Sequence, residues 1–252
     1  MRTKYFIMTA LLCAVLLLTG SVSEARTRKT VSDSTATPAF VWPRLRIGVD
    51  LGGAYAIGGI DKDLTKDLQS HEQRLRFGLA AGADVSWFFM KSLGVGLKGK
   101  LFYSYSTALI PFVANISESI KIPFFGPMIC TRVYSRSGKH CFVANLSAGY
   151  CGFFNDFYYK TPGQFAAGTL GVSGDLGYDL RLSKHLSLGF QLSVFEASLY
   201  SADEVKVKHE IINQDSVKET WGDGARSLSY IDFTIGLRYN LECRGRNNEK
   251  VK

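Results

Sequence analysis

The residues of this chain best suited to nucleophilic or acid–base chemistry are its four histidines. Two of them have a serine and acids close by in the sequence. His71 lies between Ser70 and Glu72, and the neighbours of His209 are Glu210, Asp215 and Ser216. A serine, a histidine and an acid are the components of acyl transfer, in which the histidine takes the proton of the serine nucleophile. Because geometry defines such a triad, we assign no catalytic residue from sequence proximity.

Charged side chains also recur at alternate positions in stretches whose other residues are small or apolar. The acids are Asp50, Asp84, Asp175, Asp179 and Asp232, and the bases are Arg46, Arg74, Arg76, Lys98, Lys100, Arg181 and Arg238. Alternate positions of a strand face the same side of a sheet. Buried charges must pair, because an isolated one is strongly unfavourable. These residues predict a structural ion-pair network inside the protein, and a gated, ion-conducting interior is the functional alternative.

Four of the five cysteines lie beyond the apolar amino terminus, at Cys130, Cys141, Cys151 and Cys243. None has the Cys-x-x-Cys spacing of a redox or zinc site, so we expect no metal site and no other cofactor. Cys141 and Cys151 belong to one predicted strand, about 33 Å apart, which is too far for a disulfide. Cys130, Cys141 and Cys243 fall near one end of the predicted sheet, where a disulfide and free thiols are both consistent with the sequence.

The amino terminus has the three parts of a secretory signal peptide. Arg2 and Lys4 precede the apolar run Tyr5–Leu18, and small residues follow up to Ala25. The run is shorter than the roughly 20 residues of a membrane-spanning helix. Residues 1–25 are therefore predicted to be a cleaved export signal. Residues 26–43, rich in Ser, Thr and Ala, are predicted to be a flexible lead-in, and residues 242–252 a basic tail.

Between residues 44 and 241, apolar and polar residues alternate with period two, as in strands that have one apolar face. Eight strands are predicted, at residues 44–55, 74–87, 93–106, 119–134, 141–150, 169–182, 186–194 and 230–241. The phase of the fourth is poor, and Pro123 and Pro127 predict a bulge there. Most of these strands are long enough to cross a bilayer at a tilt of about 45°, which takes about 9–11 residues.

Short and long connections alternate strictly between these strands. The short ones are Phe89–Ser92, Ser135–Lys139 and Ser183–His185, and the long ones are Ile57–Glu72, Thr107–Glu118, Phe154–Ala166 and Glu196–Arg226. Transmembrane barrels have short periplasmic turns, long external loops and aromatic girdles at both interfaces. The aromatics beside long loops are Tyr55, Tyr103, Tyr105 and Tyr150, and those beside short turns are Trp87, Tyr178 and Tyr239. His140 and His185 fall at the periplasmic turns.

Composition excludes two classes of protein, and the polar face of the strands distinguishes between two kinds of barrel. The mean hydropathy of +0.03 excludes a polytopic helical membrane protein, and 13% aromatic residues exclude a disordered chain. The polar face is rich in Gly, Ala and Ser, which suits a crowded lumen and not the solvated outer face of a soluble lipocalin-type barrel. The predicted fold is an all-β, eight-stranded antiparallel up-and-down transmembrane β-barrel over residues 44–241, with short periplasmic turns and long extracellular loops.

Three stretches carry a family resemblance: the Leu75–Trp87 strand, the Gly126-Pro127 pair before a short turn, and the closing strand Tyr230–Tyr239. With them, residues 44–241 resemble the small OmpA/OmpX-like outer-membrane barrels, in the form found in Gram-negative Bacteroidetes. The resemblance implies an outer-membrane location. Its partners would be outer-membrane lipid, lipopolysaccharide and the barrel-assembly machinery. No nucleic-acid partner is expected despite the net charge of +8. Many such barrels end on an aromatic residue, whereas here a basic tail follows.

Three functions remain open. The favoured one is a structural, surface-binding barrel with a side-chain-plugged lumen and loop-mediated interactions. In it, the loop Glu196–Arg226 would extend a hairpin for strand addition by a partner. The first alternative is a component of an outer-membrane secretion or assembly machine. The second is a lipid-A-modifying enzyme (acyl transfer or deacylation), since barrel enzymes that resemble this fold use a histidine, a serine and an acid near the outer leaflet. An enzymatic role is the less favoured expectation.

Overall fold

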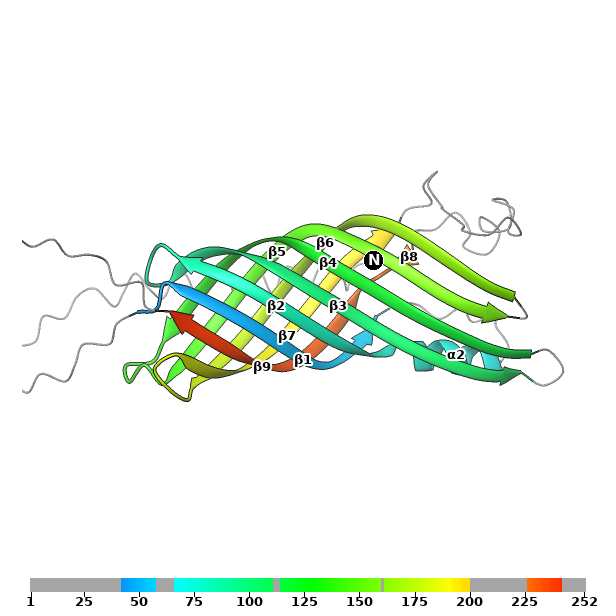
Figure 1. Cartoon of the computed structure of the whole chain (residues 1–252), viewed down its shortest axis with the longest axis horizontal. Helices are drawn as coiled ribbons and strands as arrows, with labels where there is room; N and C mark the ends of the chain where they lie inside the picture. The colour runs from blue at the N-terminus through cyan, green and yellow to red at the C-terminus, as the bar shows by residue number, and fades with distance from the viewer. Residues whose placement is uncertain (1–41, 58–65, 111–113, 160, 200–225, 242–252) are drawn as a thin grey trace, which may run out of the picture.

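The computed structural model describes residues 42–57, 66–110, 114–159, 161–199 and 226–241. Eight long strands follow one another around a closed antiparallel sheet: β1 (Leu45–Ala56), β2 (Phe77–Phe88), β3 (Leu93–Ile110), β4 (Ala114–Tyr134), β5 (His140–Tyr159), β6 (Thr161–Arg181), β7 (Leu186–Leu199) and β9 (Tyr230–Leu241). The two-residue strand β8 (Arg226–Ser227) pairs only with the end of β7. Because β9 pairs with both β7 and β1, the barrel is closed, and the predicted up-and-down fold is confirmed (Figure 1).

The outer surface of the barrel is an apolar band. On β1, Val49 and Leu51 point outward and are exposed, while Arg46, at a position of the opposite phase, points inward and is buried. Leu170 on β6 is 79% exposed. Exposing apolar surface to water costs about 25 cal/mol per Å², and lipid removes that cost. The apolar side therefore faces outward, opposite to a soluble lipocalin-type barrel, and the barrel spans a membrane.

Tight turns join the strands at the periplasmic end, on the left in Figure 1. In the turn between β4 and β5, the N–H of Gly138 donates to the carbonyl of Ser135 at 2.9 Å, and the N–H of Ser135 donates to the carbonyl of His140 at 2.8 Å. Gly138 has a φ of 66°, the left-handed conformation that a residue without Cβ adopts at no steric cost. The turn is short because glycine permits it.

Strands β3 to β6 are longer than predicted and rise above the barrel as one sheet. The expected loops Thr107–Glu118 and Phe154–Ala166 are largely strand, since β3 and β4 pair up to Ile110↔Ala114 and β5 and β6 up to Tyr159↔Thr161. β4 also pairs with β5 up to Ile116↔Tyr159. We call residues 107–110 of β3, 114–121 of β4, 154–159 of β5 and 161–168 of β6 the rising sheet (Figure 1, right). Above the lipid, neither face needs to be apolar, so the alternation that reveals a strand fades.

The predicted bulge at the prolines of β4 is wrong. The register between β4 and β5 is the same above and below them, at Ile120↔Asn155 and at Met128↔Ser147. β3 pairs along this whole stretch without interruption. Beside Pro127, a Cβ on Gly126 would collide with the carbonyl oxygen of Ala148. The close approach of two backbones holds the strands in register where proline withholds an N–H.

Helix α2 (Lys66–Leu75) occupies part of the first expected loop and the start of the second expected strand. Its carboxyl end lies against β3, because the Ser104 hydroxyl donates to the Leu75 carbonyl at 2.6 Å. Within the described residues, no helix has the length and apolar character needed to cross a membrane. The predicted signal peptide, the basic tail, Cys243, His209 and most of the loop Glu196–Arg226 lie outside the described residues.

Candidate functional site

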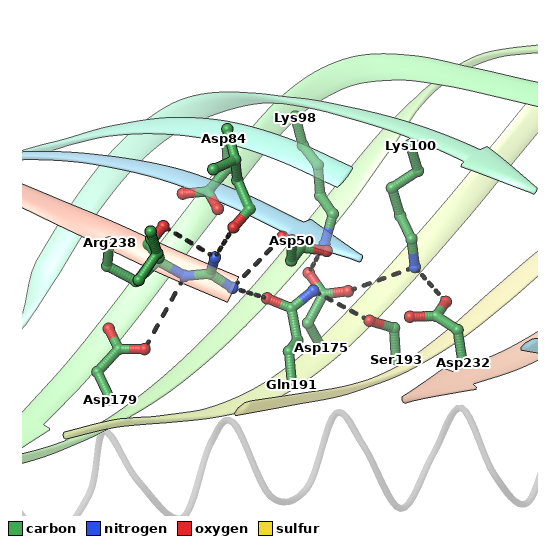
Figure 2. A network of polar contacts seen from close by, with 12 residues as sticks. Asp50, Asp84, Lys98, Lys100, Asp175, Asp179, Gln191, Ser193, Asp232 and Arg238 are labelled. Atoms are coloured by element: carbon green, nitrogen blue, oxygen red, sulfur yellow. Dashed lines mark hydrogen bonds and ion pairs between the residues drawn. The ribbon is translucent and has the colours of Figure 1, made fainter. Parts of the chain in front are cut away.

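The lumen contains a cluster of buried charges (Figure 2). Nine of the twelve charged residues predicted for the lumen lie in it, with side chains at most 7% exposed: Arg46, Asp50, Asp84, Lys98, Lys100, Asp175, Asp179, Asp232 and Arg238. They come from β1, β2, β3, β6 and β9. We call these nine residues the lumen network.

Two arginines organise the part of the network nearer the periplasm. Arg46 reaches Asp84 with Nη1 at 2.7 Å and Asp179 with Nε at 3.0 Å. Arg238 Nη2 lies 3.3 Å from Asp50, and its Nε lies 3.9 Å from Asp179. Asp179 on β6 is therefore shared by guanidinium groups from β1 and β9. These pairs join strands across the lumen as well as around its wall.

Two lysines of β3 organise the part nearer the outside. Lys98 forms an ion pair with Asp175. Lys100 Nζ lies 2.6 Å from Asp232 Oδ2 and 4.0 Å from Asp175 Oδ1. Because each lysine reaches an acid on β6 or β9, on the far side of the barrel, the side chains cross the lumen at this level.

Glycines on the lumen face make room for these large charged groups. A Cβ on Gly48 would lie 2.8 Å from Cδ of Arg238, and a Cβ on Gly189 would lie 3.1 Å from its Nε. A Cβ on Gly82 would lie 2.6 Å from Oδ1 of Asp50. The small residues that the sequence shows at inward positions are thus the space that the arginine and aspartate side chains occupy.

Three of the predicted lumen residues lie elsewhere, which corrects the prediction. Arg74 is exposed in the last turn of α2. Arg76 precedes β2 and donates to the Tyr55 hydroxyl at 3.3 Å. Arg181 ends β6 at the rim and donates to the Ser183 carbonyl at 3.0 Å. The first two were misplaced because a helix, not a strand, occupies residues 66–75.

Arg132, which was not predicted, is a buried base at the periplasmic end of the lumen. It is 2% exposed, its Nη2 donates to the Pro43 carbonyl at 2.5 Å, and its guanidinium lies 3.6 Å from the ring centre of Phe88. Backbone carbonyls and an aromatic face stabilise a cation by hydrogen bonds and by cation–π attraction. The poor phase of the fourth predicted strand concealed this inward position.

Above the lumen network, aromatic rings fill the barrel. Tyr230 stacks against two rings, with centroid distances of 5.1 Å to Phe102 and 4.8 Å to Phe195. Phe124 meets Phe195 edge-on at 5.3 Å. All four are at most 3% exposed. We call these four residues the aromatic layer. The prediction of a polar and small lumen face therefore does not hold for this upper part, where inward positions carry large rings.

A cluster of polar side chains lies on the extracellular side of the aromatic layer, on the inner face of the sheet where the rising sheet begins. Ser106 Oγ lies 3.1 Å from His71 Nδ1, and His71 Nε2 lies 3.2 Å from Glu118 Oε2. Asn155 Nδ2 donates to Glu118 Oε1 at 2.7 Å. The partners of His71 thus come from β3 and β4, at positions that sequence proximity did not indicate.

The other described histidines, His140 and His185, and the described cysteines have simple environments. His140 Nδ1 lies 2.6 Å from the Tyr178 hydroxyl, and His185 Nδ1 lies 3.1 Å from the Asn240 carbonyl, both at the periplasmic end as predicted. Cys130, Cys141 and Cys151 are free and buried. In the part of the chain that the structure describes, no three His, Cys, Asp or Glu side chains converge in the way that a metal site requires.

On the outside of the rising sheet, a polar trio crosses β4, β5 and β6. Lys121 Nζ lies 2.9 Å from Asp156 Oδ2, and Gln164 Nε2 donates to Asp156 Oδ1 at 2.6 Å. The hydrogen bond from Lys121 lowers the pKa of Asp156 below its usual value, and the same bond raises the pKa of Lys121. Charged groups on an outward face do not enter lipid, so this trio lies above the membrane.

The sequence matches no protein-family model, and no curated protein is matched by sequence. Solved structures of outer-membrane barrels are similar to it. Neisserial surface protein A is 10% identical, covering 78% of this chain and 97% of its own, with a TM-score of 0.46. Ail of Yersinia pestis is 10% identical over 78% and 98%, with a TM-score of 0.43. OprG of Pseudomonas aeruginosa is 13% identical over 79% and 97%, with a TM-score of 0.42. The closed order of eight strands in this chain is the fold of a small outer-membrane barrel.

Proposed function

We propose that this protein is a non-conducting barrel of the Gram-negative outer membrane whose role is to present the rising sheet to a partner at the cell surface. The observation that carries the proposal is the rising sheet itself, four paired strands that continue beyond the membrane on a barrel filled with side chains. Residues 1–25 would direct export, and the barrel-assembly machinery would insert the chain. Lipid and lipopolysaccharide would surround it.

The filled lumen supports a role outside the barrel. An ion entering from the extracellular side would meet the aromatic layer and then the lumen network, and both are buried and closely packed. An eight-stranded barrel has an interior just wide enough for its own side chains. The filled lumen therefore supports the proposal of a function on the surface of the protein, where the rising sheet offers contacts to a partner.

The rising sheet ends in strand edges that are suited to an added strand. Within the described residues, β7 pairs with β6 only from Gly171↔Ala197 toward the periplasm. Among the described residues, residues 161–168 of β6 therefore extend beyond β7 as an edge. An edge strand presents N–H and C=O groups that an extended peptide can pair with. The partner that fits this edge is an extended segment of another surface protein.

Conductance in planar lipid bilayers tests the closed lumen. The purified full-length protein is expected to insert without measurable single-channel current. Stable conductance steps across several preparations would contradict the non-conducting barrel.

Photocrosslinking on living cells tests the recognition surface. A photoreactive amino acid replacing Gln164, on the exposed edge strand, is expected to crosslink to a defined protein. The same group replacing Leu170, which faces lipid, is the matched control and is expected to give no protein adduct. Equal adducts from both positions would rule out recognition by this edge.

The same method separates this function from that of a secretion or assembly component. A machine subunit would also be contacted at the periplasmic rim, so the photoreactive group is placed at Lys184 in a second strain. Protein adducts from Lys184, with none from Gln164, would favour the machine component and overturn the surface role.

A further inference from the structure

We propose that Ser106, His71 and Glu118 form a hydrolytic site for short-chain carboxylic esters at the extracellular mouth of the barrel, with Ser106 as nucleophile. This activity goes beyond the proposed surface role and does not depend on it. It rests on four side chains that four elements bring together: His71 of α2, Ser106 of β3, Glu118 of β4 and Asn155 of β5.

The sheet register explains why these side chains meet. Ser106 and Glu118 are directly opposite each other on β3 and β4, so both point to the same face of the sheet. That face is the inner one, since Ser106 is 4% exposed while its neighbour Tyr105 points outward at 57%. Asn155 on β5 lies opposite Ile120 of β4, two residues from Glu118, on the same face. α2 places His71 over this row of residues.

The proposed mechanism uses one arrangement of the imidazole proton. With Glu118 ionised, a proton on His71 Nε2 makes the 3.2 Å contact a hydrogen bond to the carboxylate. The neutral ring then has its lone pair on Nδ1, and this nitrogen lies 3.1 Å from Ser106 Oγ. The hydroxyl therefore donates to the base that would remove its proton. Asn155 holds the other carboxylate oxygen of Glu118 and acts as a positioning residue.

Ser104, also on the inner face of β3, is a serine with a structural role and serves as a comparison. It lies two residues earlier on the same face of β3, and its hydroxyl contacts the carbonyls of Leu75 at 2.6 Å and Phe77 at 2.9 Å. Those contacts fasten the end of α2 to β3 and offer no base. Ser106 contacts a histidine nitrogen instead, which is the contact that a nucleophile needs.

The surroundings indicate the class of substrate. Ile120, opposite Ser104, and Phe153 belong to the buried apolar cluster under the site, which suits an acyl group. Ser106 and His71 are each 4% exposed, whereas the side chain of Glu118 is 19% exposed. The small exposed fraction of Ser106 and His71 favours the smallest acyl groups, such as acetyl, over a long acyl chain. The substrate is therefore a short acyl ester on a surface molecule, and not the long-chain ester of a lipid.

The reaction has two balanced steps. Ser106 Oγ bonds to the ester carbonyl carbon, its proton passes to His71 Nδ1, and the alkoxy C–O bond breaks as that proton moves to the departing alcohol. Water then attacks the acyl-serine, giving a proton to Nδ1. The bond to Oγ breaks, Oγ regains the proton, and the carboxylic acid is released. No oxidant, reductant or metal takes part.

The test uses the full-length protein in detergent with p-nitrophenyl acetate and an alkyl fluorophosphonate. We expect esterase activity and a mass shift on the peptide that contains Ser106. Ser106→Ala should abolish the adduct and reduce hydrolysis to background, and His71→Gln should lower kcat/KM about 100-fold or more. Ser117→Ala, beside Glu118 on β4 but on the opposite face of the sheet, is the matched control and should retain both signals. The heat-dependent gel shift of folded barrels establishes that each variant has folded.

Two further readouts separate catalysis from a structural role. Glu118→Gln should lower kcat with little change in KM, because the imidazolium that forms during the reaction loses the anion beside it. p-Nitrophenyl palmitate should be hydrolysed far more slowly than the acetate. A folded protein without the Ser106 adduct, or equal rates for Ser117→Ala and Ser106→Ala, would overturn the proposal.

Discussion

Arg238 is the residue on which the periplasmic part of the lumen network depends. Its guanidinium lies near Asp50 and Asp179, and Nη1 also donates to the Val49 carbonyl at 3.0 Å. All of these partners are shielded from water. Removal of the arginine would leave Asp50 without this cation in a closed lumen and would leave Asp179 with Arg46 alone, which makes the residue far more costly to lose than a surface arginine.

We predict that Arg238→Met destabilises the barrel by about 3–5 kcal/mol, the cost of leaving a buried ion pair without one partner. Urea unfolding in detergent micelles, followed by tryptophan fluorescence, measures the change. Arg181→Met, at the exposed rim, is the control and should change stability by less than about 0.5 kcal/mol. Equal effects of the two substitutions would contradict the buried network.

Phe195 is the corresponding residue of the aromatic layer. Its ring is fully buried and packs against both Phe124 and Tyr230. Phe195→Ala is expected to cost about 3–5 kcal/mol, because the surrounding strands cannot close the cavity that the ring leaves. The same urea titration measures it. Phe77→Ala, whose ring is 68% exposed to lipid, is the control and should cost clearly less.

The sequence allowed most inward charges to be predicted, and the reason is local. Period-two alternation fixes which side of a strand each residue faces, so Arg46, Asp84 and Asp175 could be placed from their spacing. It does not determine which acid meets which base, because that depends on strand tilt and register. For the same reason Ser106 and Glu118, twelve residues apart in sequence, could not be recognised as partners of His71.

At the scale of whole elements, the rising sheet differs from the strands within the membrane. Its outer face has Lys121, Asp156 and Gln164 in place of lipid-facing apolar residues, and the contacts between these three residues link β4, β5 and β6. Strand prediction relied on apolar alternation, which stops where the lipid stops. The elements inside the membrane could therefore be located, whereas the rising sheet and α2 could not.

The ion pair across β4 and β5 gives a pH-dependent contact. The pKa of Asp156 is lowered in the folded state, so its stabilising effect is present above the ordinary pKa and is lost as the pH falls through the lowered value. Lys121→Ala is expected to raise the pKa of Asp156 toward the ordinary range. NMR titration of the aspartate carboxyl carbon detects this. An unchanged titration curve would show that Lys121 does not lower the pKa of Asp156.

For the molecule as a whole, two stacked layers fill one narrow barrel, and each alone should block ions. The aromatic layer lies above Lys100, whose Nζ is 5.4 Å from the ring centre of Tyr230, so the layers are in contact. We predict that the double variant Phe102→Ala/Phe195→Ala remains non-conducting in planar bilayers if it folds, since the ion pairs below it persist. Open-channel currents from this variant would show that the aromatic layer alone seals the lumen.

The cross-lumen ion pairs also limit the order in which the barrel can be assembled. Lys100 of β3 finds Asp232 only when β9, the last strand of the chain, has taken its place beside β1. Until then the aspartates and lysines of the half-formed sheet need water. The growing barrel must stay hydrated on its concave side, and closure of the β1–β9 seam is the moment at which the interior dries.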